Sequence, residues 1–170
     1  MPGRLIGIAR KGRPRGEMET LDHAMVGIET GIAGDYRGAM RPGKINRRQV
    51  TIMAAEDWMA ALAELGEPVS WEQRRANLLV EGIVLPREPG TRLKVGKVLV
   101  EITGECDPCR RMDTVADGLL LALMPDWRGG RTARVIEGGD IALGDRVSCF
   151  DATEQTDDGT VTWLSGRSTT

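Results

Sequence analysis

Residues 93–113 read LKVGKVLVEITGECDPCRRMD, an alternating apolar and polar run that ends in two cysteines. Its central part, 97–103, places three β-branched residues on one face of an extended chain: Val98, Val100 and Ile102. This is the pattern of a half-buried strand. The stretch therefore predicts a strand followed by a bend at Asp107 and Pro108 that presents Cys109.

Further short β-prone runs, separated by glycine-bearing turns, surround this strand. They show no regular alternation of strand and helix, which argues against a doubly wound sheet. A Gly-Gly pair at 138–139 predicts a hairpin between the last two of these runs. The predicted strands lie at 4–9, 48–53, 97–103, 132–136 and 141–150.

Two segments have the composition of helices. Residues 54–65 carry Trp58 on an apolar stripe and end at Gly66, and residues 114–124 end at Pro125. The fold class predicted is mainly β, a β-barrel with a few peripheral α-helices (α+β by content). The barrel domain is expected to span 1–150, followed by a polar tail at 151–170 in which VTWL can add one edge strand.

Length and cysteine content limit the class of protein. A chain of 170 residues suits one domain, and three cysteines are too few for a secreted disulfide scaffold. No export signal opens the chain, and its longest apolar stretch, at 118–125, is far shorter than the roughly 20 residues of a membrane-spanning helix. We expect a cytoplasmic protein that does not contact a membrane.

Arginine dominates the basic residues. The formal net charge is −2, yet arginine supplies 19 of the 23 basic residues, many of them in clusters at 10–15, 47–48, 74–75 and 110–111. Nucleic-acid binding is not expected, because the chain lacks a net basic charge and has one Phe, one Tyr and four Trp for base stacking. Each arginine pair can be a solvated strand end or a local anion site.

The Cys106–Cys109 pair has several possible uses. A structural zinc site would need every available ligand, namely all three cysteines and His23. Disulfide exchange of the thioredoxin type expects a βαβ setting, which this β-rich chain lacks. The two thiols can also simply be buried small residues. His23 and Cys149 receive no functional role, and Cys149 is expected to pack in the core beside Val147.

Five segments, in this order, resemble the MOSC domain, the C-terminal module of molybdenum cofactor sulfurases that also occurs as stand-alone bacterial proteins. The resemblance covers roughly residues 4 to 150. The segments are GIAGDYRG (31–38), RRQVTIMAAEDW (47–58), RRANLLVEGI (74–83), LKVGKVLVEITGECDPCRRMD (93–113) and ARVIEGGDIALGDRV (133–147).

The resemblance implies a pocket for the molybdenum cofactor (Mo-molybdopterin) and a functional cysteine in the PC motif, here Cys109, as metal ligand or persulfide carrier. Cys106 is not part of the carried-over pattern. Many stand-alone members have a histidine after the GD loop where this chain has Arg37. The implied cofactor-binding residues are Asp35, Arg47, Arg48, Arg75, Asn77 and Arg110.

The residue chemistry agrees with this implication. Thiolate is a soft ligand that suits a thiophilic metal, and cysteine is also the side chain that can carry a persulfide. Positive charge on Arg110 and Arg111 would favour the thiolate of Cys109. The guanidinium fork suits the cofactor phosphate, and the amide of Asn77 can donate and accept hydrogen bonds at the pterin edge.

Three functions remain open. The first is a molybdenum-cofactor protein in which Cys109 ligates the metal during reduction of a small, possibly N-hydroxylated substrate; it would need a separate electron-transfer protein. The second is a sulfur carrier that receives persulfide sulfur on Cys109 from a donor such as a cysteine desulfurase. The third is a non-catalytic interaction module. A stand-alone module of this type is expected to work without pyridoxal phosphate.

Overall fold

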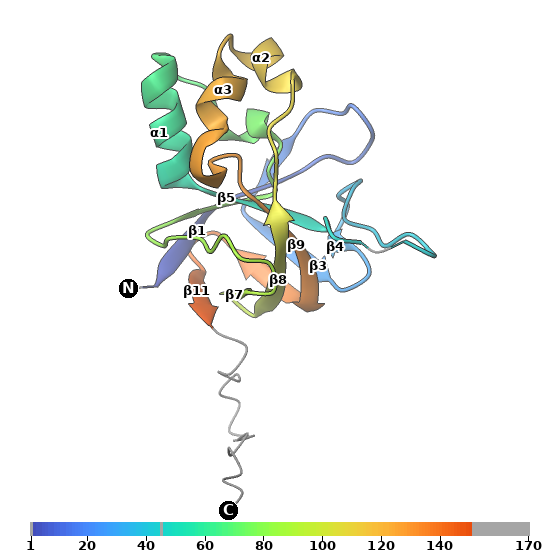
Figure 1. Cartoon of the computed structure of the whole chain (residues 1–170). Helices are drawn as coiled ribbons and strands as arrows, with labels where there is room; N and C mark the ends of the chain where they lie inside the picture. The colour runs from blue at the N-terminus through green and yellow to red at the C-terminus, as the bar shows by residue number, and fades with distance from the viewer. Residues whose placement is uncertain (1, 45, 151–170) are drawn as a thin grey trace, which may run out of the picture.

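A closed β-barrel forms the body of the molecule in the computed structural model, which describes residues 2–44 and 46–150 (Figure 1). Its strands follow the order β11-β7-β8-β9-β5-β6-β1, and β1 pairs with β11 to close it. These strands are β1 (Gly3–Arg10), β5 (Val50–Ala54), β6 (Leu78–Glu81), β7 (Arg92–Val95), β8 (Val98–Glu105), β9 (Arg131–Glu137) and β11 (Arg146–Phe150). The predicted fold class is confirmed.

The remaining strands lie outside this ring. β2 (Glu19–Leu21) extends the barrel sheet beyond β1. A second sheet has the order β10-β3-β4, with β10 (Gly139–Ala142), β3 (His23–Gly27) and β4 (Gly31–Ile32).

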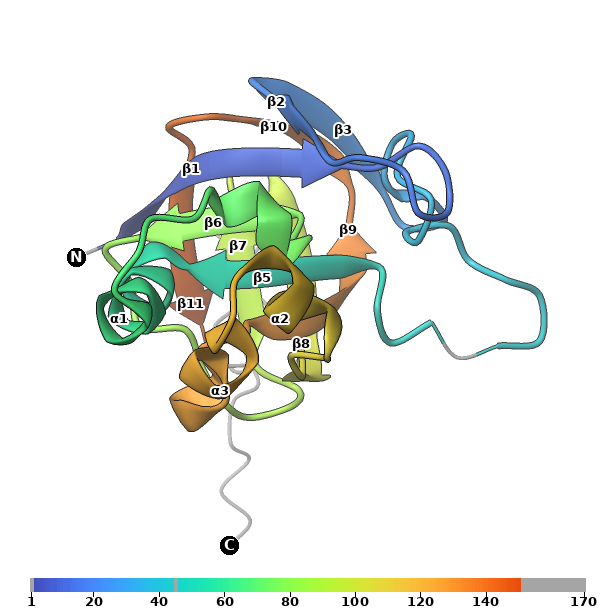
Figure 2. The same cartoon turned by 90° about the horizontal axis from the view of Figure 1, so that it is seen from above.

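The helices gather on one side of the barrel, next to β5 (Figures 1 and 2). They are α1 (Ala55–Leu65), α2 (Arg111–Val115) and α3 (Leu119–Leu123), with two 3-10 helices, η1 (Trp71–Arg74) and η2 (Pro125–Trp127). None of the helices in the described ranges combines the length and apolar character needed to cross a bilayer.

Two apolar clusters account for the packing. The first fills the barrel with inward-facing strand residues such as Ile8, Ile52 and Ile102, all fully buried. The second lies between the helices and the outer face of β5 and β6, where α1 contributes Trp58 as predicted. The helices therefore cover one side of a barrel that is already closed and filled.

The first predicted helix is confirmed, whereas the second is wrong. Gly66 ends α1 in the left-handed conformation, with φ of 81°. The segment predicted as a single helix over 114–124 instead belongs to two short helices, because Ala116 is extended and Gly118 has φ of 92°. The carboxylate of Asp113 accepts the backbone N–H of Leu120 at 3.0 Å and links the two.

The hairpin predicted at Gly138–Gly139 is also wrong. β9 pairs with β5 and β8, whereas β10 pairs with β3, so the two runs separate at the glycines. Neither glycine has a positive φ. A Cβ on Gly138 would lie 2.6 Å from the carbonyl oxygen of Val26, so this glycine permits close approach of β3 rather than a tight turn.

Two smaller expectations concern single residues near the barrel ends. Cys149 is exposed rather than buried beside Val147; β11 still pairs with β7 at this position, but its pairing with β1 has ended at Val147. His23 is exposed on β3. The predicted tail at 151–170, with its edge strand, lies outside the described residues.

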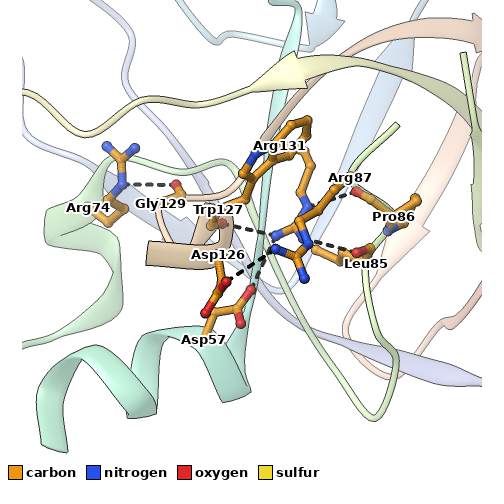
Figure 3. Close-up of polar contacts among 9 residues, drawn as sticks. All are labelled: Asp57, Arg74, Leu85, Pro86, Arg87, Asp126, Trp127, Gly129 and Arg131. Carbon is orange, nitrogen blue, oxygen red and sulfur yellow. Dashed lines mark hydrogen bonds and ion pairs between the residues drawn. The ribbon is translucent and has the colours of Figure 1, made fainter. Parts of the chain in front are cut away.

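A buried arginine ties the loops below the helices to β9 (Figure 3). Arg131 is 3% exposed and donates hydrogen bonds to the carbonyl oxygens of Leu85, Pro86 and Trp127 at 3.0–3.1 Å. It also pairs with Asp57 of α1 at 3.2 Å, and its guanidinium carbon lies 5.6 Å from the centre of the Trp127 ring. In the described residues, each hydrogen-bond or ion-pair partner of this guanidinium is an acceptor.

Candidate functional site

A pocket of about 220 Å³ opens where several strand ends and loops meet. Its walls come from the end of β1, the loop after β4, β5, the segment between η1 and β6, and the β8–α2 connection. A second hollow of about 610 Å³ shares Met18, Arg75 and Arg111 with it, so these residues border both hollows, which together are called the depression.

Positive charge dominates the pocket walls. Two carboxylates, those of Asp35 and Asp107, face a larger set of cations: Lys11, Arg37, Arg48, Arg74, Arg75 and Arg111. In the described ranges none of these six cations forms an ion pair, whereas the ion-paired arginines lie elsewhere in the molecule. The pocket is strongly cationic in a chain whose formal net charge is −2.

This cluster changes the ionisation of its own members. Burial lowers the pKa of Lys11, and the like charges of Arg37, Arg75 and Arg111 lower it further. Burial also lowers the pKa of Arg75, followed by the charges of Arg111 and Arg37, while Cys109 acts in the opposite direction. An anion in the pocket would relieve this mutual repulsion.

Arg75 is the most unusual residue of the site. Its backbone has φ of 69°, a left-handed conformation that is rare for a residue with a Cβ. Nη1 of its guanidinium is buried and has no hydrogen-bond partner in the described part of the chain. Arg74, directly before it, is satisfied by backbone and sulfur acceptors.

The two cysteines of the opening stretch differ in their surroundings. Cys109 is exposed and lines the pocket. Cys106 is 3% exposed, its backbone N–H donates to Gly130, and its sulfur accepts a hydrogen bond from Arg74 at 3.4 Å. Both are free thiols. The predicted role of Cys109 as catalytic residue or metal ligand is compatible with its place in the pocket and stays a prediction.

Five of the predicted site residues come together in the pocket walls: Asp35, Arg48, Arg75, Asn77 and Cys109. The Asn77 amide accepts from the N–H and hydroxyl of Thr51 and donates to the carbonyl of Ala9, at 3.0–3.1 Å. It therefore joins β1, β5 and β6. Asp35 accepts the backbone N–H of Lys11 at 3.1 Å. Both residues hold the walls of the pocket in place.

Two predicted cofactor-binding residues do not line the pocket. Arg47 is exposed, and its carbonyl oxygen accepts a hydrogen bond from the hydroxyl of Thr103. Arg110 is exposed and precedes the first turn of α2. In each of these arginine pairs the second member, Arg48 or Arg111, faces the pocket.

Several lining residues were not predicted from the sequence, in particular Lys11, Thr51 and Arg74. The arginine-rich cluster at 10–15 and the pair at 74–75 were the available signals for the two cations. Only the resemblance to the MOSC domain distinguished Arg75 from Arg74. In the described ranges no group of three or more His, Cys, Asp or Glu side chains is arranged to hold a metal ion.

The barrel, with a thiol beside a cationic pocket, agrees with a match to a known protein family. The family model of the MOSC domain matches residues 32–148, more than half of the 170-residue chain. The chain belongs to the MOSC domain family, the family of the molybdenum cofactor sulfurase-like domain.

Solved structures with the same fold include YuaD from Bacillus subtilis, with a TM-score of 0.73 and 19% identity over 86% of this chain and 94% of that one. YiiM from Geobacillus stearothermophilus has a TM-score of 0.66 and 16% identity over 89% and 77% of the two chains. YiiM from Escherichia coli has a TM-score of 0.63 and 16% identity over 89% and 72%. The search of curated proteins found no match.

Proposed function

We propose that this chain binds the molybdenum cofactor in the cationic pocket, with Cys109 as the thiolate ligand of molybdenum, and reduces a small, possibly N-hydroxylated substrate. The observation that carries the proposal is the arrangement around Arg75. A buried guanidinium nitrogen without a partner lies in a wall shared with other cations and with the one thiol that lines the pocket.

The donor set of the pocket fits this group. Molybdopterin carries a phosphate, and a guanidinium offers paired, charge-assisted hydrogen bonds to phosphate oxygens. Arg75 and Arg111 are the arginines best suited to this task, since they line both parts of the depression. Together the two hollows reach the size range of ligand pockets, about 300–1,000 Å³. Thiolate is the soft ligand that a thiophilic metal prefers.

Each chain residue then has a defined task. Cys109 supplies the sulfur, Arg75 and Arg111 hold the phosphate, and Asn77 and Asp35 keep β1, β5 and the Lys11 segment in register around them. When bound, the cofactor supplies two-electron redox chemistry. Reduction of an N-hydroxyl group consumes two electrons and two protons and releases the amine and water. The electrons would come from a separate electron-transfer protein.

Metal and pterin analysis tests the proposal. The full chain, purified from a host that makes the cofactor, is expected to contain molybdenum and pterin in near-equal amounts. Cys109→Ser should lower the molybdenum content about tenfold or more, because the only thiolate in the pocket wall is lost. Cys106→Ser, the matched control, should keep it. Wild-type protein that lacks both molybdenum and pterin after reconstitution would overturn the proposal.

A second candidate, a persulfide carrier, is favoured by one observation: Cys109 is exposed, so a donor protein can reach its sulfur. The Cys109 thiolate would attack the outer sulfur of the persulfide on a cysteine desulfurase and release the desulfurase thiolate; an acceptor thiolate would then attack the outer sulfur on Cys109 and release the Cys109 thiolate. Loading with a desulfurase should add cyanide-releasable sulfur to wild type and to Cys106→Ser but not to Cys109→Ser. Absence of such sulfur on wild type removes this candidate.

A further inference from the structure

The segment that carries Cys109 is held by an arginine outside the predicted set. Arg74, at the end of η1, is 5% exposed and forms no ion pair in the described residues. Its Nη2 donates to the carbonyl oxygen of Cys106 at 2.8 Å and to its sulfur at 3.4 Å. Its Nε donates to the carbonyl of Gly129 at 3.0 Å, as Figure 3 shows. One guanidinium thus joins three parts of the chain that are distant in sequence.

Cys106 is consequently fixed at three atoms. Its N–H donates to the carbonyl of Gly130 at 2.9 Å, while its carbonyl oxygen and sulfur accept from Arg74. Residues 106–109 have no regular secondary structure between β8 and α2. At the far end of this segment, the carbonyl of Cys109 accepts the N–H of Met112 at 2.9 Å. The anchored Cys106 and the start of α2 therefore determine where Cys109 lies.

Gly129 completes the contact. A Cβ at this position would lie 2.7 Å from the Cys106 carbonyl oxygen, 3.0 Å from Nη2 of Arg74 and 3.2 Å from Cδ of Pro108. The first of these distances is shorter than folded proteins allow, and it involves backbone that cannot simply rotate away. Only glycine lets η1, the Cys106 carbonyl and the start of β9 approach this closely.

We propose that Arg74 and Gly129 form a clamp that positions Cys109 at the cationic wall of the pocket, acting through Cys106 and Pro108. Both are positioning residues, because their contacts are with the Cys109 segment and not with its sulfur. The clamp also gives Cys106 a role: it is the attachment point, and Cys109 is the group presented. If the clamp is lost, cofactor loading should fall, and this expectation rests on the proposed function. The placement of the Cys109 thiol by the clamp does not rest on it.

Two variants separate positioning from charge. Arg74→Lys keeps the positive charge but cannot reach Gly129 and Cys106 together, since an ammonium lacks the planar fork. Gly129→Ala changes no charge and pushes against the Cys106 carbonyl and Pro108. Arg128→Met is the matched control, because Arg128 bonds Ala122 and Glu64 and has no recorded contact with the Cys109 segment.

The test measures how Cys109 reacts with two alkylating reagents of similar size, iodoacetate, an anion, and iodoacetamide, which is neutral. All proteins carry Cys149→Ser, since Cys149 is exposed and would react as well. The ratio of the two rate constants cancels changes in thiolate fraction and general access, and reports the local positive field at the sulfur. We expect the ratio to fall about threefold or more in both clamp variants and to be unchanged in Arg128→Met.

Hydrogen exchange of the segment gives an independent measurement. Peptides that cover the Cys106 and Met112 amides should exchange faster in both clamp variants, while β5 and β6 keep wild-type exchange as evidence of a folded barrel. Wild-type reagent ratios in both Arg74→Lys and Gly129→Ala would overturn the clamp. A wild-type chain that fails to load molybdenum would refute the proposed function, but the reagent ratio would still decide the clamp.

Discussion

Arg131 and Arg75 both have buried guanidinium nitrogens, but their surroundings differ. Arg131, below the helices, is enclosed by three carbonyl oxygens, the Asp57 carboxylate and the Trp127 ring (Figure 3). Arg75, in the pocket wall, has a buried Nη1 without a partner and faces further arginines. Burial lowers the pKa of both guanidinium groups; the Asp57 carboxylate opposes this shift at Arg131, whereas at Arg75 the opposing group is the Cys109 thiol.

We interpret the charge of Arg131 as structural, and we propose that the charge of Arg75 serves to bind an anion. A buried charge with a full set of acceptors holds neighbouring segments together, and the fold depends on it. A buried donor without a partner costs free energy in the unliganded protein. Arg75 also has a left-handed backbone, which adds to this cost. On the proposed function, a bound anion would complete the hydrogen bonds of Arg75 and offset this cost.

The largest effect is expected at Arg131. Arg131→Met should lower the free energy of unfolding by about 3–5 kcal/mol, because three buried or partly buried carbonyl oxygens and Asp57 lose their donor. Urea denaturation measures the change. Arg134→Met, on the same strand, is the control: Arg134 is half exposed and paired with Glu101, so its loss should cost less than about 1 kcal/mol. Equal losses in the two variants would contradict the structural assignment of Arg131.

An anion is expected to stabilise the pocket region specifically. Inorganic phosphate at about ten times its dissociation constant should add roughly 1.4 kcal/mol to wild-type stability. Chloride at equal ionic strength should not, and it serves as the control for screening. Arg75→Ala should abolish the increment, while Arg134→Ala should keep it. Stabilisation by phosphate that is the same in all three proteins would show that Arg75 has no special part in anion binding.

The sequence alone predicted where the strands and helices lie better than it predicted which strands pair with one another. Alternation at 97–103 and Gly66 at the end of α1 are local signals, and both are confirmed. The failed hairpin at Gly138–Gly139 shows the limit. Glycine permits close packing as well as turns, and the contact with Val26 that decides between them joins residues far apart in sequence.

The candidate site was only partly predictable, because contacts between residues far apart in sequence decide which side chains face the pocket. Arginine pairs indicated anion binding, but only the fold shows which member of a pair faces the pocket. Arg74 and Arg75 are adjacent, yet the left-handed backbone at Arg75 sends one side chain to the Cys109 segment and leaves the other without a partner. The amide of Asn77 makes three bonds within the barrel and also lines the pocket, so its predicted contact with a ligand stays a prediction.

Relief of backbone strain at Arg75 should raise the free energy of unfolding, whereas the substitution at Arg131 lowers it, and the change should be smaller. Arg75→Gly and Arg75→Ala both remove the guanidinium, but only glycine adopts φ of 69° without a Cβ penalty. The glycine variant should therefore be more stable than the alanine variant by about 1 kcal/mol. Both should lose molybdenum loading. A glycine variant no more stable than the alanine variant would mean that position 75 carries no backbone strain.

The smallest expected effect is a change in pH dependence at Asp57. Burial raises the pKa of this carboxyl above its ordinary 3.8, while Arg131 opposes the shift. The folded protein therefore holds the Asp57 proton more tightly than the unfolded chain. Its contribution to stability is full below pH 3.8 and is lost as the pH rises through the folded pKa. Asp57→Asn cannot titrate and should lack this slope.

Urea unfolding of wild type and Asp57→Asn between about pH 3.5 and 6.5 measures the effect, since other carboxylates cancel in the difference between the two proteins. The free energy of unfolding of wild type, minus that of Asp57→Asn, should decrease as the pH rises. The same comparison in an Arg131→Met background sharpens the test. Without the guanidinium that opposes the shift, the loss with rising pH should be steeper. A difference that increases with pH would mean that the ion pair with Arg131 outweighs the burial of Asp57.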